Sequence, residues 1–180
     1  MASSIAPEAP MRRVMVIGCP GAGKTTLARR LARQLGLPIV CLDLHFWRPG
    51  WRIPDTGIWR EQVTALAALP EWVMDGNYSS TYDVRMARAD SLVWLDYPRH
   101  VCVRRVLLRT LRDYGRTRPD LPEGCPERLD LAFLRYVWGF PREHRPRIVA
   151  GIEQFGSHLH TTRLVCDSDV EAFLTQNRAS

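Results

Sequence analysis

Short apolar runs alternate along the chain with segments whose apolar residues recur every three or four positions. The first run, Arg13–Ile17, is continuously apolar after its first residue, which is typical of a strand buried on both faces of a sheet. Apolar residues then recur with helical spacing over Lys24–Leu35, and Gly36 favours a helix end. This alternation predicts an α/β domain with a parallel sheet.

The same pattern predicts further strands and helices. The strands are expected at Ile39–Leu42, Trp72–Asp75, Ser91–Leu95 and Leu159–Val165. The helices are expected at Thr56–Leu69, Arg99–Tyr114, Leu129–Trp138, Arg142–Phe155 and Val170–Asn177. Turn residues are dense in 43–53, which should be irregular, and in 115–127, which should be a mobile loop. We expect a single domain over residues 11–180, preceded by a disordered tail at residues 1–10.

The composition fits a folded domain that does not enter a membrane. Of the 180 residues 46% are hydrophobic, which rules out a disordered chain. No apolar run approaches the roughly 20 residues that a membrane span needs. The five cysteines are scattered without metal-ligand spacing, so neither a zinc site nor a disulfide framework is indicated. Reduced thiols and a start without an apolar signal-peptide core indicate a cytoplasmic protein.

The positive charge is concentrated in one part of the chain. Lys24 is the only lysine among the 25 Lys and Arg residues, and residues 99–147 hold 12 arginines against six acidic residues. This surplus accounts for the whole formal charge of +6, because the rest of the chain has 13 cations and 13 anions. A basic segment suggests a polyanionic partner, such as nucleotide phosphates, nucleic acid or an acidic surface.

A phosphate-binding motif follows the first expected strand. The octapeptide GCPGAGKT, residues 18–25, matches G-x-x-x-x-G-K-[ST] at every fixed position and leads into an amphipathic helix. In such a loop backbone N–H groups surround a phosphate, Lys24 reaches the β- and γ-phosphates, and the Thr25 hydroxyl coordinates Mg²⁺. We therefore expect ATP and Mg²⁺ as ligands. The expected nucleotide-binding residues are Gly18, Cys19, Pro20, Gly21, Ala22, Gly23, Lys24, Thr25 and Thr26.

Three carboxylates follow apolar runs and are candidates for the metal site. Asp75, which follows the third expected strand and precedes Gly76, is the first choice, because the strand beside the first one usually supplies this ligand. Asp43 follows the second strand, where a base for an acceptor hydroxyl or a more distant magnesium contact would lie. Asp96 either contributes to the site or caps the next helix.

Arginines share one face of the helix expected at Arg99–Tyr114. Arg105, Arg109, Arg112 and Arg116 are spaced four, three and four apart, which places them within a band of roughly 60° on a helix. The stripe leads through Arg118 into the loop at 115–127. We interpret at least two of these arginines as part of a lid that closes over phosphates, although a solvated face is the alternative. Arg142 and Arg145 are weaker lid candidates.

Aromatic residues cluster beyond Asp43. Phe46, Trp47 and Trp51 are candidates either to stack on a substrate ring or to close a small satellite core, and the residue pattern favours neither. His45, two residues after Asp43, is a candidate to assist it.

The motifs together resemble a known group of enzymes. The strand–GCPGAGKT–helix start, the VMDGNY sequence and the late arginine-rich segment are similar to adenylate-kinase-like P-loop kinases. The sequences LDLHFWRPGW, MDGNY, RTRPDLPEGCPE and FLRYVWGFP resemble, more closely, the family of DNA topology modulation (FlaR-related) proteins. This similarity extends from about Met11 to Leu174.

The resemblance implies a fold and roles for several residues. It implies a five-stranded parallel sheet in the order 2-3-1-4-5 with helices on both faces, and the use of ATP and Mg²⁺. Arg105 and Arg109 lie nine and thirteen residues after Asp96. At these positions the resemblance implies that Arg105 covers the adenine and Arg109 contacts phosphate. The segment 166–168, which ends at Ser168, would run alongside the adenine.

Departures from the related kinases leave the acceptor open. The adenylate-kinase sequence D-G-F-P-R is replaced by Asp75-Gly76-Asn77-Tyr78-Ser79, so its arginine is missing, with Arg85 or Arg88 as possible substitutes. The T-G-x-x-x-R segment is also absent. Shikimate-type kinases carry two Asp after the second strand, and here the second is His45.

Two functional hypotheses follow. The first is a kinase that transfers the γ-phosphoryl group of ATP to a nucleotide, nucleoside or other small acceptor. Lys24, Asp43, Arg105 and Arg109 would be its catalytic residues, and residues 112–147 its lid. The alternative is an ATP-binding regulatory protein that acts on nucleic acid. It is less favoured, because no helix-turn-helix, aromatic RNA-binding pair or basic arm is present.

Overall fold

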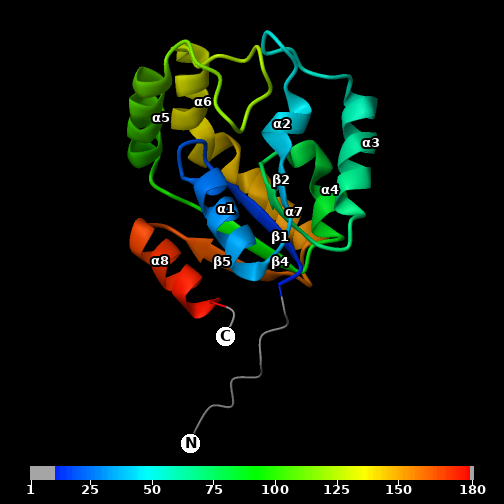
Figure 1. Ribbon diagram of the computed structural model, residues 1–180. Helices are drawn as coiled ribbons and strands as arrows, with labels where there is room; N and C mark the ends of the chain where they lie inside the picture. The colour runs from blue at the N-terminus through cyan, green and yellow to red at the C-terminus, as the bar shows by residue number, and fades with distance from the viewer. Residues whose placement is uncertain (1–10, 179–180) are drawn as a thin grey trace, which may run out of the picture.

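Five parallel strands form one sheet in the order β2-β3-β1-β4-β5 (Figure 1). The computed structural model describes residues 11–178; the tail expected at residues 1–10 lies outside the described residues. The strands are β1 (Arg13–Gly18), β2 (Ile39–Cys41), β3 (Trp72–Asp75), β4 (Ser91–Leu95) and β5 (His160–Leu164). The predicted fold class and strand order are therefore confirmed.

Helices cover both faces of this sheet. The longer helices are α1 (Lys24–Leu35), α3 (Thr56–Ala67), α5 (Arg99–Asp113), α6 (Leu131–Glu143), α7 (Arg145–Phe155) and α8 (Asp167–Gln176). Two α-helices, α2 (Leu42–Phe46) and α4 (Tyr82–Met86), and the 3-10 helix η1 (Ser79–Thr81) are short. Helices α1 and α8 lie on one face, where Gln34 donates a hydrogen bond to the Leu174 carbonyl, and α4 and α7 lie on the other (Figure 1). No helix within residues 11–178 is long and apolar enough to cross a membrane.

The sheet is buried because its central strands are almost wholly apolar. In β1, Val14, Met15, Val16 and Ile17 are completely inaccessible to solvent. Such strands need cover on both faces, which the flanking helices provide. The core therefore lies on either side of β1, β3 and β4, and polar residues are left to the ends of the strands, where the loops gather.

Several elements differ from the expected ones for local reasons. The segment after β2 was expected to be irregular, but its first residues form helix α2. Asp130 caps α6, since its carboxylate accepts hydrogen bonds from the backbone N–H groups of Ala132 and Phe133, so this helix begins later than expected. It then continues through Pro141, which removes only one N–H group near the helix end. The short helix α4 carried too few residues for a periodic signal.

The segment 115–127 is a loop, as expected, but it is packed against the body of the protein. Leu121 and Cys125 are buried, and so are the charged side chains of Asp120 and Glu127. Backbone bridges join Tyr114 to Glu127 and Thr117 to Pro126, so the two ends of the segment are held together. We call residues 114–127 the lid loop.

The phosphate-binding loop lies very close to the first turns of α5. Gly21 has a φ of +85°, and a Cβ atom added there would lie 2.4 Å from the Cys102 carbonyl oxygen. Gly23 also has a positive φ, +97°, but a Cβ atom at that position would meet no atom within 4 Å. Glycine is therefore required at residue 21 by both conformation and space, and at residue 23 by conformation alone.

We expect Gly21→Ala to destabilise the protein more than Gly23→Ala does. The positive φ costs each alanine variant about 1 kcal/mol, and the backbone clash at residue 21 adds about 1–3 kcal/mol. Urea unfolding followed by circular dichroism measures both free energies of unfolding. Equal destabilisation of the two variants would contradict the close approach of this loop to α5.

Candidate active site

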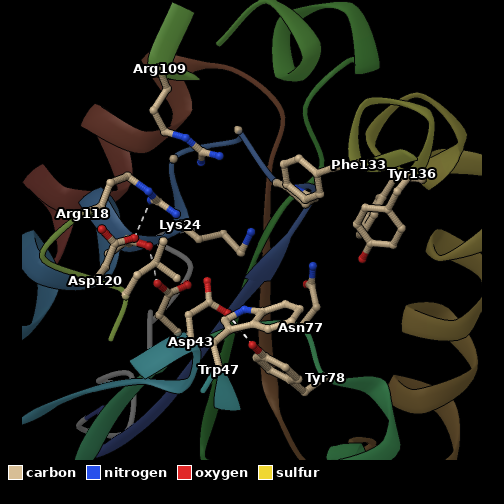
Figure 2. A pocket seen from close by; sticks show the side chains of 18 of the residues that line it. Lys24, Asp43, Trp47, Asn77, Tyr78, Arg109, Arg118, Asp120, Phe133 and Tyr136 are labelled. Carbon is tan, nitrogen blue, oxygen red and sulfur yellow. Dashed lines mark hydrogen bonds and ion pairs between the residues drawn. The ribbon is translucent and has the colours of Figure 1, made fainter. Parts of the chain in front are cut away.

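A cavity of about 720 Å³ lies at the carboxyl ends of β1, β2 and β3. This edge of a parallel sheet is where ligands bind in open α/β folds. One end of the cavity is formed by the loop between β1 and α1, and the other by aromatic residues of α6 and of the segments after α2 and β3. Figure 2 shows Lys24, Asp43, Arg109 and Arg118 directed into this space.

The loop between β1 and α1 has the conformation of a phosphate-binding loop. The residues of the motif that line the cavity are Pro20, Gly21, Gly23, Lys24, Thr25 and Thr26, whereas Gly18, Cys19 and Ala22 lie behind them. The Lys24 ammonium donates a hydrogen bond to the Cys19 carbonyl, with an Nζ–O distance of 3.2 Å. The Lys24 ammonium group is thus held at the opening of the loop, where a phosphate would bind.

A side-chain amide joins the phosphate-binding loop to the end of β3. The Gly18 N–H group donates to Asn77 Oδ1 at 2.9 Å, and Asn77 Nδ2 donates to the Gly18 carbonyl at 2.7 Å. Sequence analysis did not assign a role to Asn77. The feature of the sequence that could have identified Asn77 is its position two residues after Asp75, at the same sheet edge as the glycine-rich loop.

Arg85 stabilises the backbone around Asn77 and is not positioned to bind phosphate. Its side chain is completely buried and donates to the carbonyls of Gly76 at 2.9 Å and Tyr78 at 3.0 Å, and also to the Asn77 carbonyl. Burial lowers the pKa of Arg85 to about 10. Arg88 lies elsewhere, with its guanidinium near the Ala67 and Ala68 carbonyls. Neither arginine replaces the one missing from the adenylate-kinase sequence, because neither lines the cavity.

Thr25 and Asp75 form the pair expected at a magnesium site. The Thr25 hydroxyl donates to Asp75 Oδ2 at 2.5 Å, and Asp75 Oδ1 is buried without a hydrogen-bond partner. Burial raises the pKa of Asp75 from 3.8 to about 6, although Lys24 and the Thr25 hydroxyl oppose this shift. An unpartnered, buried carboxylate oxygen beside a threonine hydroxyl fits a hard divalent cation that keeps several other oxygen ligands.

Asp43, in α2, lines the cavity close to Asp75. The Tyr78 hydroxyl donates to Asp43 Oδ1, and the pKa of Tyr78 is raised by burial, so the phenol stays protonated. Asp43 Oδ2 makes no hydrogen bond within residues 11–178 and remains able to accept one. His45 does not assist Asp43: it does not line the cavity, and its Nδ1 lies 3.3 Å from Gln62 Nε2.

The aromatic residues after Asp43 have two different roles. Phe46 packs against Trp59 and Tyr78, with ring centroids 5.0 and 4.6 Å away, and does not line the cavity. Trp47 and Trp51 do line it and contact each other edge to face at 5.2 Å. The satellite-core interpretation is therefore correct for Phe46, whereas Trp47 and Trp51 are positioned to meet a ligand.

Five arginines of the basic segment line the cavity: Arg105, Arg109, Arg118, Arg128 and Arg147. Arg105 donates to Asp167 and lies over the Tyr97 ring, 5.0 Å from its centroid. Arg112 points away, with a side chain 76% exposed and paired with Asp113. The expected stripe is thus divided: its first two members face the cavity and Arg112 faces solvent.

Two buried carboxylates hold Arg109 of α5 and Arg118 of the lid loop, which we call the lid arginines, in place. Glu127 Oε1 lies 3.2 Å from Arg109 Nε and 2.6 Å from Arg118 Nε, and Arg118 Nη1 lies 2.6 Å from Asp120 Oδ2. The Thr110 hydroxyl donates to the other oxygen of Glu127. Asp120 and Glu127 were not identified from the sequence, where they appear only as charges in a turn-rich segment.

The lid loop is also bonded to the turn that carries the tryptophans. Gly50 N–H donates to the Gly124 carbonyl at 2.8 Å, and Trp51 Nε1 donates to the Pro126 carbonyl at 3.2 Å. The Cys125 thiol lies 3.3 Å from the Arg48 carbonyl. These contacts join the two sides of the cavity mouth.

Other candidates from the sequence lie outside the cavity wall. Ser168, the second residue of α8, does not line the cavity, although its neighbour Asp167 pairs with Arg105. Asp96 neither caps α5 nor reaches the cavity, because its carboxylate pairs with Arg145 and Arg163. Arg142 also lies away from the cavity, so neither Arg142 nor Arg145 belongs to its wall.

Comparison with known families agrees with the loop and the sheet. The AAA domain family AAA_18 matches residues 14–123, which span the phosphate-binding loop, β3 and most of the lid loop. The chain therefore belongs to this family of P-loop domains. No curated protein matches the chain significantly in sequence.

Solved structures share the fold at low sequence identity. Shikimate kinase from Acinetobacter baumannii, in complex with shikimate, is 15% identical, with a TM-score of 0.52 over 92% of this chain and 90% of that one. A gluconokinase from Sinorhizobium meliloti 1021 is 16% identical, with a TM-score of 0.52 and 95% of each chain covered. Shikimate kinase from Bacteroides thetaiotaomicron is 20% identical, with a TM-score of 0.50 over 92% of this chain and 95% of that one.

We expect Asp75→Asn to raise the thermal stability of the ligand-free protein at pH 8, and to raise it less at pH 5. The folded-state pKa of Asp75, about 6, lies above the ordinary value of 3.8, so the folded protein binds a proton that the unfolded chain does not. The stability of the wild type therefore falls as the pH rises through this interval, and asparagine removes that loss. Differential scanning fluorimetry at both pH values measures the change. A decrease in Tm at pH 8 would contradict the burial of an uncompensated carboxylate.

Proposed function

We propose that the protein is a small-molecule kinase that transfers the γ-phosphoryl group of ATP·Mg²⁺ to a hydroxyl or phosphate acceptor. The observation that carries this proposal is the shared cavity, in which the phosphate-binding loop, Asp43 and the lid arginines face one another. The finer resemblance to adenylate-kinase-like and topology modulation proteins supports the same chemistry and leaves the acceptor open.

The nucleotide would occupy the end of the cavity formed by the phosphate-binding loop. Arg105, held by Asp167 beside the Tyr97 ring, is suited to cover the adenine. Lys24 would contact the β- and γ-phosphates. Thr25 and Asp75 would hold Mg²⁺, which, when bound, supplies charge neutralisation at these phosphates.

Phosphoryl transfer requires a nucleophile in line with the γ-phosphate and a group that takes up its proton. For a hydroxyl acceptor, the acceptor oxygen would form a bond to the γ-phosphorus while the bond to the β–γ bridging oxygen breaks and ADP leaves. Asp43 Oδ2 would accept the hydroxyl proton, because Asp43 Oδ1 is already engaged by Tyr78. The Tyr78 hydrogen bond thereby orients the base.

The lid, residues 112–147 in this proposal, would stabilise the charge that moves during transfer. Arg118 has a side chain only 16% exposed, and two of its nitrogens are engaged by Asp120 and Glu127. Its remaining nitrogen, Nη2, is free to contact a phosphoryl oxygen in the cavity (Figure 2). Cations fixed before the reaction stabilise developing charge without reorganisation, which is a large part of enzymatic rate acceleration.

The alternative role on nucleic acid receives less support from this arrangement. Most cations of the basic segment that line the cavity or flank it are already paired with carboxylates, including Arg105, Arg109 and Arg118. Non-specific nucleic-acid binding depends on free surface cations that neutralise backbone phosphates. The arginines that line the cavity are therefore better suited to a nucleotide held inside it than to a nucleic-acid backbone.

Lys24→Ala is expected to abolish ATP turnover, by at least about 100-fold, while the domain stays folded, because the phosphates lose their central cation. Release of ADP, measured with a coupled assay and an acceptor panel, gives the rate, and circular dichroism gives the folded state. Arg33→Ala, on the exposed end of α1, is the matched control. Wild-type turnover in Lys24→Ala would show that this mechanism is wrong.

Glu127→Gln is expected to lower kcat by about 10–100-fold with a smaller change in the KM for ATP. The amide keeps the size of the side chain but removes the charge that orients Arg109 and Arg118. Steady-state kinetics separates the two constants. Glu171→Gln, which removes the carboxylate from an exposed pair with Arg30, is the control. A change in KM alone, or equal losses in both variants, would contradict the role of Glu127.

A further inference from the structure

A second hollow lies between α5 and α6 and shares no lining residue with the cavity at the sheet edge. The two helices pack side by side (Figure 1). The hollow between them has a volume of about 530 Å³. Its apolar lining is formed by Val103 of α5 and by Leu131, Leu134 and Trp138 of α6. The proposed phosphoryl transfer uses none of these residues.

Trp138 is the largest apolar side chain of this hollow and is only partly covered. It is 50% exposed, although tryptophan is on average one of the more buried residue types. The Arg99 guanidinium of α5 lies over its ring, 4.2 Å from the centroid, so this contact spans the two helices. Leu131, two turns earlier on α6, is 66% exposed. Large apolar side chains that are exposed together in a concave surface indicate a binding site.

The arginines that line this hollow have no acidic partners within residues 11–178. Arg135 and Arg142 alternate with Leu131 and Trp138 at spacings of four, three and four residues, which places all four on one face of α6. Both arginines are exposed, and neither forms an ion pair in the described part of the chain. The lining holds three arginines against one carboxylate, Glu143, which leaves two positive charges in excess.

A concave apolar surface bordered by unpaired cations fits an acidic amphipathic helix. The apolar side chains of such a helix, one turn apart, would fill the hollow, and its carboxylates would pair with the arginines. A second copy of this chain is a poorer occupant, because a twofold dimer through this face would bring the same arginines together. A membrane is also a poorer occupant, since apolar groups must protrude to enter lipid and these groups line a hollow.

We propose that the hollow between α5 and α6 is a docking site for an acidic amphipathic helix of a partner protein. Trp138 would contact an apolar side chain of the partner, and Arg135 and Arg142 would pair with its carboxylates. This binding does not rest on the proposed kinase function. The inner faces of the same two helices carry Arg109 and Phe133, which line the cavity, so a docked partner would lie directly behind the cavity wall.

Selection from a phage-displayed library of helical peptides, with the full chain as bait, tests this proposal without a known partner. Selected peptides should carry apolar residues three or four positions apart, flanked by Asp or Glu. Fluorescence anisotropy then measures the Kd of a labelled selected peptide, with single-stranded oligothymidylate measured in parallel. Replacing the acidic residues of the peptide by Asn and Gln should weaken binding at least about fivefold. Raising NaCl from about 50 to about 300 mM should also weaken it.

Variants of the protein assign the contacts. Trp138→Ala should weaken peptide binding at least about tenfold, because buried aromatic anchors dominate such interfaces. Arg135→Gln should weaken the acidic peptide about two- to fivefold and leave its Asn/Gln version unchanged. Arg33→Gln in the last turn of α1 and Ile58→Ala on α3, which is 59% exposed, are the controls that should alter neither affinity. Circular dichroism checks the fold of each variant, and the exposed Arg135 provides the test if Trp138→Ala unfolds.

The proposal is overturned if the selected peptides are neutral or basic, or if no selected peptide binds at micromolar concentration. It is also overturned if Trp138→Ala, when folded, and Arg135→Gln both leave the peptide Kd unchanged. Tighter binding of oligothymidylate than of the peptide, lost in Arg135→Gln, would make a nucleic acid the occupant and would likewise overturn it.

A turnover assay separates this proposal from the kinase function. Arg135→Gln should lose peptide affinity and release ADP at the wild-type rate. Lys24→Ala should lose ADP release and bind the peptide with the wild-type Kd. Peptide binding by a wild-type protein that transfers no phosphate would support the docking site and contradict the kinase function.

Discussion

The paired hydrogen bonds between the Asn77 amide and Gly18 are the contact on which the rest of the site depends. They join the carboxyl ends of β1 and β3, so the phosphate-binding loop and Asp75 keep a fixed separation. The buried Arg85 guanidinium holds the carbonyls on either side of Asn77 and prevents this turn from relaxing. The Thr25–Asp75 pair and the Tyr78–Asp43 pair both follow from that rigid junction.

Part of the charge of this protein is fixed in the cavity wall by buried carboxylates. Arg109 and Arg118 are held by Glu127 and Asp120, which are buried carboxylates, and are directed toward the space in front of Lys24. Buried ion pairs contribute little net stability, because desolvation offsets their attraction. Their value here is orientation: a cation that is already desolvated and fixed can act on a phosphate without first being ordered.

The resemblance to adenylate-kinase-like P-loop kinases predicted the sheet order. Sequence patterns predicted the limits of α1 and the placement of Lys24, Thr25 and Asp75 on one cavity, because these features depend on local motifs and strand ends. They could not predict the partners of Arg85, since a guanidinium that binds backbone carbonyls has the same sequence signature as one that binds phosphate. Glu127 and Asp120 were missed for a similar reason. The burial of Glu127 and Asp120 depends on how the lid loop packs against the body of the protein. No hydrophobic periodicity in the sequence indicates that packing.

The bonds between the lid loop and the turn at residues 48–52 make the two sides of the cavity mouth mechanically dependent. A displacement of the lid loop must either break the contacts of Gly50 and Trp51 or carry that turn with it. By thermodynamic linkage, a ligand on the tryptophan side that favours closure of the lid loop would strengthen phosphate binding by the lid arginines. Phosphate binding would then strengthen the binding of that ligand by the same factor. If the protein binds two ligands in this cavity, synergism between them would follow from the connectivity of the loops, without any contact between the ligands themselves.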